Sequence, residues 1–183
     1  MLSQFLKSLQ NFFNYHSFLW LIVAVLGFIA VWALIEYHLD RHELLYRLIN
    51  GTILGITVLL IAWGTLIHRP SLNYTVSIIP LSLLFRSFDD SIIFMSMVLN
   101  IVLFIPLGMF GYCAFRVASK KAAVILIASG VAFSVLIEVL QYAMSLGNAE
   151  IDDVICNTLG LLAGCLLYDL YRRYILHRAK KKE

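Results

Sequence analysis

The sequence predicts an all-α, polytopic membrane protein with about five transmembrane helices. Of its 183 residues, 61% are hydrophobic and 14% are charged, and the mean hydropathy is +0.87. A soluble domain has about 45–50% apolar and about 25% charged residues, so this chain has too few charged side chains to cover a water-facing surface. The composition therefore excludes a cytosolic enzyme, a secreted disulfide scaffold and a disordered segment.

Five apolar windows approach the length of about 20 residues that a membrane-spanning helix needs. They are Phe18–Ile35, Leu48–Ile67, Ile92–Phe115, Ala122–Met144 and Val154–Tyr171. Residues 1–16 place apolar side chains roughly on one helical face, which predicts a short interfacial helix. Residues 70–90 hold an apolar stretch that is broken by Pro80 and too short to cross, which predicts a re-entrant or interfacial segment. We expect a single transmembrane domain over residues 1–183.

The distribution of basic residues predicts the orientation. With five spans, eleven Lys and Arg residues lie in segments on one side of the membrane and three on the other, and six of the eleven lie in the tail, residues 172–183. Cytoplasmic segments are enriched in Lys and Arg, so we expect the N-terminus outside and the C-terminus in the cytoplasm. A basic tail beside an apolar span indicates contact with anionic lipid head groups, and no nucleic-acid partner is expected.

Polar side chains recur at helical spacing in three predicted spans, at steps of four, three and four residues in two of them, and so share one face of each helix. The stripes are Ser134, Glu138, Gln141 and Ser145; Asp153, Asn157, Gly160 and Gly164; and Asn100, Phe104, Gly108 and Gly111. An ionisable side chain near the centre of a span costs at least about 2.5–3.5 kcal/mol by insertion scales, so Glu138 most strongly indicates a functional site. In the expected orientation, the three stripes place polar groups at similar depth in the outer leaflet.

These stripes define the candidate site. The functional polar cluster that we expect is Asn100, Glu138, Gln141, Asp153 and Asn157, with Arg86, Asp152 and Ser134 as secondary candidates and Gly108, Gly160 and Gly164 as helix-packing positions. Arg86 would pair with Glu138 if residues 70–90 fold inward. The structural alternative is that the amides only join helices and that Asp152 or Asp153 caps the fifth helix. Joining helices has no need of a carboxylate at Glu138.

No metal or cofactor is expected. Glu138, Asp152 and Asp153 would suit a hard cation such as Mg²⁺ or Ca²⁺ rather than zinc, but they meet no ligand-spacing rule. The three cysteines lie in apolar runs without a CxxC pair, which indicates small buried residues rather than a redox site. The sequence also lacks a Ser-His-Asp order, a GxSxG motif and a phosphate-binding glycine loop.

Three motifs within residues 95–170 resemble those of the VanZ-like family of bacterial membrane proteins, in the family's order and spacing. They are the run from Asn100 through Pro106 to Gly108, then Glu138-Val139-Leu140-Gln141, then Glu150-Ile151-Asp152-Asp153 through Asn157 and Gly160 to Gly164. The chain departs from the family at Ser77-Ile78-Ile79-Pro80-Leu81, where members typically have Asn-x-x-Pro-Phe. It also lacks an Arg before the acidic motif, at Leu146-Gly147-Asn148, which makes Arg86 a candidate substitute.

The resemblance implies a place in the bacterial plasma membrane and a role in resistance to teicoplanin-type glycopeptides or in cell-envelope upkeep. Our first hypothesis is that the polar cluster engages a lipid-linked wall precursor, a polar lipid or the antibiotic. The second is a membrane enzyme acting on a lipid or lipid-phosphate through Glu138 and Asp153. The third is a scaffold or regulatory subunit that recruits partners through the Gly160/Gly164 face and the basic tail. Membrane lipids are expected partners in each case, and an oligomer is compatible with all three.

Overall fold

The computed structural model describes residues 43–66, 76–87, 91–115, 119–146 and 148–180, and the isolated positions 23, 27 and 32. The chain forms two units, Met1–Arg41 and His42–Glu183, and every element described below belongs to the second unit. The predicted interfacial helix, residues 1–16, lies outside the described residues, as does the predicted span Phe18–Ile35 except for the three isolated positions.

Four long helices make up most of the second unit: α2 (Glu43–Leu66), α4 (Ser91–Ala114), α5 (Lys120–Ala143) and α6 (Ile151–Lys180). Each is long and apolar enough to cross a membrane, which confirms the all-α polytopic class for the described part of the chain. All four helices begin earlier than predicted, by one to five residues, because charged and polar residues at their ends can continue a helix although they lower the local hydropathy. Thus α2 includes Arg47, and α6 includes Asp152 and continues into the basic tail.

The two ends of α5 have side-chain and backbone caps. Ser119 is the N-cap, and its side chain accepts a hydrogen bond from Ala122 N at 3.2 Å. The helix ends at Ala143 with Met144 as its C-cap, and the next residue, Ser145, has a φ of 61° in the left-handed region. The predicted polar stripe is therefore wrong at its last member, because Ser145 lies beyond the helix.

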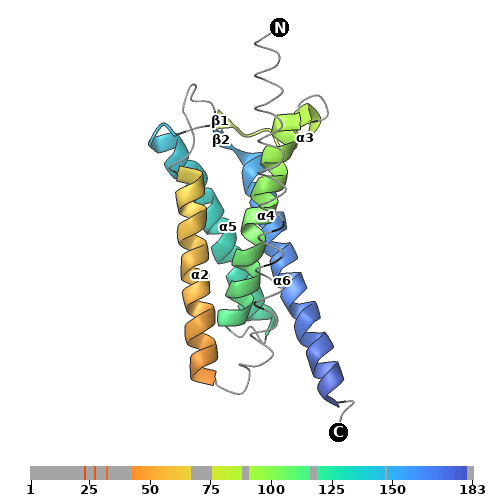
Figure 1. The fold of residues 1–183 in the computed structure, drawn as a ribbon. Coiled ribbons are helices and arrows are strands. Elements are labelled where there is room, and N and C mark those ends of the chain that lie inside the picture. Colours follow the sequence, from red (N-terminus) through yellow and green to blue (C-terminus); the bar gives the residue numbers. More distant parts are fainter. Residues whose placement is uncertain are drawn as a thin grey trace, which may run out of the picture. The chain divides into compact units, whose positions relative to one another are not determined.

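The described part of the segment between α2 and α4, residues 76–87, is partly extended. It contains β1 (Val76–Ser77), a turn at Pro80 and the six-residue helix α3 (Ser82–Ser87). The strand pairs in parallel with β2 (Ala149–Glu150), with Val76 opposite Ala149. The sequence predicted a non-spanning segment here but not this strand pair, which joins residues more than 70 positions apart at the start of α6 (Figure 1).

Helices α4 and α6 make the most extensive contact between elements in the described residues. Three glycines allow it: a Cβ on Gly108 would overlap the carbonyl oxygen of Leu161, and Cβ atoms on Gly160 and Gly164 would overlap backbone carbonyl oxygens of α4. The Gly160/Gly164 face is therefore covered by α4 within the chain. The scaffold hypothesis is wrong on this point, because that face is not available to recruit a partner.

Chain direction alternates from α2 to α4, α5 and α6, so the described unit has two ends (Figure 1). We call the end with β1, β2 and α3 the strand end and the opposite end the basic end. Among basic residues whose side chains are described, Arg86 alone lies at the strand end. The others lie towards the basic end: Arg47, Lys120, Lys121, Arg172 and Arg173. This asymmetry agrees with the predicted placement of the basic end in the cytoplasm, which stays a prediction.

Candidate functional site

The polar faces of α5 and α6 meet at a buried hydrogen bond. Asn157 Nδ2 donates to Ser134 Oγ at 2.9 Å. Because α5 and α6 run in opposite directions, one helical turn from this pair towards the strand end leads to Glu138 on α5 and to Asp153 on α6. The two carboxylates therefore lie at the same level on facing helices, and their residues are 6% and 3% exposed.

Helix α4 brings Asn100 to the level of Asn157. A Cβ on Gly160 would overlap the carbonyl oxygen of Ile101, so the turn of α4 that contains Asn100 lies beside residues 157–160 of α6. Asn100 is buried, at 7% exposure. We call this set of buried side chains the polar layer: Asn100, Ser134, Glu138, Gln141, Asp153 and Asn157.

Within the described part of the chain, three buried amide atoms of the polar layer have no hydrogen-bond partner: Asn100 Nδ2, Gln141 Oε1 and Asn157 Oδ1. Two of these residues use their other amide atom to join helices, since Gln141 Nε2 donates to Thr65 O of α2 at 2.9 Å and Asn157 Nδ2 donates to Ser134. A buried polar atom without a partner costs about 1–3 kcal/mol. The layer therefore has more hydrogen-bonding capacity than joining the helices uses.

Glu138 also contacts the strand end. Its Oε2 atom accepts a hydrogen bond from the backbone N of Glu150 at 3.0 Å, which ties β2 to α5. Since β2 pairs with β1, this carboxylate holds the strand pair beside the polar layer. One part of the role of Glu138 is thus structural, and a Gln side chain, which keeps a carbonyl oxygen, can perform it.

Asp152 holds the segment before α4 rather than its own helix. One carboxylate oxygen accepts from Leu81 N at 2.5 Å, and the other accepts from Leu83 N at 2.6 Å and from Ser82 Oγ at 3.3 Å. Leu81 has a φ of 64°, which is uncommon for a residue other than glycine. Asp152 therefore fixes a strained turn and the start of α3, and the expectation that it would cap the fifth predicted helix is wrong.

Arg86 does not complete the polar layer. It is an exposed residue in the last turn of α3, and within the described residues it makes no ion pair with the buried Glu138. The pairing considered for these two side chains is therefore absent, and a role for Arg86 in place of the family's Arg stays a prediction.

The described residues contain no group of three or more His, Cys, Asp or Glu side chains placed to hold a metal ion. Both carboxylate oxygens of Asp152 bond to residues 81–83. The polar layer offers buried amide, hydroxyl and carboxyl groups that can form hydrogen bonds.

The sequence interpretation missed a second polar set, the tyrosine network, nearer the basic end. Tyr46 Oη lies 2.7 Å from Cys113 Sγ and 2.8 Å from Tyr168 Oη, so it joins α2, α4 and α6. All three residues are at most 5% exposed. Reading Cys113 only as a small residue concealed this network, although Tyr168 inside an apolar run was a usable signal, because a buried Tyr hydroxyl usually has a partner.

Comparison with known sequences places these features in a family context. The sequence model of the VanZ/LLP1 family matches residues 4–172. The match extends beyond the motif region, residues 95–170, and includes the first two predicted spans. No match was found among curated proteins or among solved structures.

Proposed function

The chain belongs to the VanZ/LLP1 family, and on that premise we propose that it is a multi-pass cell-envelope protein whose polar layer binds a ligand from the outer face of the membrane. The ligand is a lipid-linked wall precursor, a polar lipid or a teicoplanin-type glycopeptide. Occupation of the layer reduces the action of the glycopeptide on the envelope.

The observation that carries this proposal is the set of unpartnered amide atoms on Asn100, Gln141 and Asn157. Each belongs to a residue that is at least nine-tenths buried. Polar groups at membrane depth are costly unless they serve packing or a site. Packing already uses one amide atom of Gln141 and one of Asn157, which leaves the remaining atoms for a ligand.

The hydrogen-bond donors and acceptors of the polar layer indicate which kind of ligand would fit it. Gln141 Oε1 and Asn157 Oδ1 accept hydrogen bonds, Asn100 Nδ2 donates one, and Glu138 and Asp153 add carboxylates at one level. Among the described residues, no Lys or Arg belongs to the layer. A ligand that presents amine or hydroxyl donors and at least one acceptor therefore fits better than one that presents only anionic oxygens.

The direct experiment expresses Glu138→Gln and Asp153→Asn variants in a glycopeptide-susceptible host and measures the inhibitory concentration of a teicoplanin-type antibiotic. We expect both variants to insert normally and to give no more protection than empty vector. Asp169→Asn is the matched control, because Asp169 lies on α6 towards the other end and pairs with Arg173 at 2.8 Å. Full protection by Glu138→Gln or Asp153→Asn would contradict the proposal.

A second candidate is a membrane enzyme acting on a lipid or lipid-phosphate. The facing positions of Glu138 and Asp153 favour it, because acid–base catalysis commonly uses two groups in one site. The purified protein would be incubated with candidate lipids, with and without Mg²⁺. Turnover that Glu138→Gln abolishes would favour the enzyme, whereas saturable binding without turnover favours the binding protein.

A further inference from the structure

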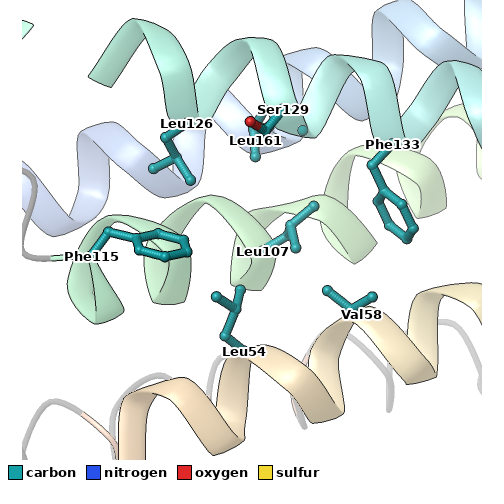
Figure 2. Close-up of a pocket in the computed structure, with 9 residues that line it drawn as sticks. Leu54, Val58, Leu107, Phe115, Leu126, Ser129, Phe133 and Leu161 are labelled. Atoms are coloured by element: carbon teal, nitrogen blue, oxygen red, sulfur yellow. The ribbon is translucent and has the colours of Figure 1, made fainter. Parts of the chain in front are cut away.

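An apolar groove of about 170 Å³ lies between α2, α4 and α5, away from the polar layer. Figure 2 shows Phe115 and Leu126 at one end of the groove and Val58 and Phe133 at the other. Its one hydroxyl, on Ser129, donates to Ile125 O of its own helix at 2.8 Å. The groove therefore presents no unmet hydrogen-bonding group and suits a hydrocarbon.

The groove is narrow and runs along the helices. From Leu126 to Phe133 it extends over ~10 Å of α5, and its volume is about 170 Å³. A helix segment of that length is about 10–12 Å wide with its side chains and needs a much larger space. The groove therefore suits one extended chain rather than a further helix.

Basic residues lie beyond one end of the groove. Lys120 and Lys121 begin α5, with Lys121 ~7.5 Å before Leu126 along the helix axis, and both are exposed. Helix α2 runs parallel to α5, since Thr65 and Gln141 bond at the strand end. Exposed Arg47 therefore lies at the same end as the two lysines. These cations are positioned as a basic site between spans that attracts an anionic head group.

The groove also matches the depth of one leaflet. The hydrocarbon core of a bilayer is about 30 Å thick, so each leaflet is ~15 Å deep. From Lys121 to Phe133, α5 rises ~18 Å. A lipid with its head group at the lysines thus has an acyl chain that reaches about as far as Phe133, where the groove ends.

We propose that this groove binds one acyl chain of an anionic phospholipid from the leaflet at the basic end, with the lipid phosphate against Lys120, Lys121 and Arg47. The site is separate from the polar layer and does not depend on the function proposed for it. Phosphatidylglycerol is a suitable probe, because its single negative charge distinguishes it from phosphatidylcholine with equal chains.

The test is native mass spectrometry of the full chain purified with a mixture of equal amounts of these two lipids. We expect wild type to retain one phosphatidylglycerol, and Ser129→Phe, which fills the groove, to retain none. Ala128→Phe is the matched control, because Ala128 is exposed on α5 but does not line the groove, and it retains the lipid. Val58→Phe and its exposed neighbour Leu59→Phe repeat the comparison from α2, in case Ser129→Phe does not fold.

The contribution of the basic residues to head-group binding is tested separately. The double variant Lys120→Gln, Lys121→Gln is expected to keep one lipid but to lose the preference for phosphatidylglycerol. Retention of lipid by both Ser129→Phe and Val58→Phe would overturn the groove site. A wild-type protein that retains no lipid would overturn it as well, and this is the result expected if residues 18–35 or a second copy of the chain fill the groove. Equal retention of the two lipids by wild type would overturn the anionic selectivity.

Discussion

The polar layer and the tyrosine network are two buried polar regions of one helix bundle. They differ in whether their buried polar atoms have hydrogen-bond partners. In the tyrosine network, Tyr46 Oη contacts both of its neighbours, and three helices are joined. In the polar layer, three amide atoms have no partner. A completed network adds to stability, whereas an incomplete one lowers it. The comparison indicates a structural role for the tyrosine network and supports the ligand-binding role proposed for the polar layer.

The largest expected effect is a loss of stability that is confined to the strand end. Asp152→Ala removes the acceptors of the amides of Leu81 and Leu83, each a hydrogen bond to a charged group and so worth about 1.5–3 kcal/mol. We expect residues 76–87 to open more easily by about 3 kcal/mol, while the tyrosine network stays closed. Amide hydrogen exchange measures both regions in one sample.

Asp152→Asn is the control for that substitution, since it keeps one acceptor oxygen and should give an intermediate effect. Unchanged exchange in residues 76–87 of Asp152→Ala would show that the carboxylate does not hold the strained turn at Leu81. Faster exchange around Tyr46 as well would mean that the two regions are coupled, against the comparison.

A smaller loss of stability is expected to affect the polar layer and the tyrosine network together. Gly160→Ala places a Cβ against the carbonyl oxygen of Ile101, so α4 and α6 must separate, and we expect a loss of about 2 kcal/mol in unfolding free energy, as for an overpacked core. Gly55→Ala is the matched control, because a Cβ there meets nothing within 4 Å. It should be neutral or stabilising by up to about 1 kcal/mol. Unfolding in detergent by SDS titration compares the two, and equal stability would contradict the close α4–α6 contact.

Much of the fold follows from the sequence, because hydropathy and helical spacing are local properties. Four predicted spans correspond to α2, α4, α5 and α6, and Ser134 and Asn157, which bond to each other in the structure, both belong to predicted polar stripes. What could not be predicted depends on contacts between distant residues. The pairing of Val76 with Ala149 and the bonds from Asp152 to residues 81–83 are of this kind.

The sequence predicted which polar side chains form the candidate site, and the structure shows that they are buried, but the sequence did not predict the partner of each. Glu138, Asp152 and Asp153 all read as carboxylates beside apolar runs, and spacing alone cannot assign a partner to each. In the structure Asp152 is used by the turn at Leu81, and Glu138 also holds Glu150 N. The proposed function rests on the unpartnered amide atoms. Whether an amide atom has a partner depends on contacts between helices, so the sequence alone cannot show it.

The substitution with the smallest expected change in stability tests most directly the central claim that the polar layer serves binding rather than stability. Asn100→Leu replaces a buried amide whose Nδ2 has no partner with an apolar side chain of similar size, so unfolding free energy should stay the same or rise by about 1 kcal/mol. Tyr46→Phe, in the completed network, should lower it by about 1 kcal/mol. Both variants are measured for unfolding in detergent and for glycopeptide protection in cells. We predict that Asn100→Leu abolishes protection at undiminished stability and that Tyr46→Phe keeps protection at reduced stability; the reverse pattern, with Asn100→Leu destabilised and still protective, would contradict the account.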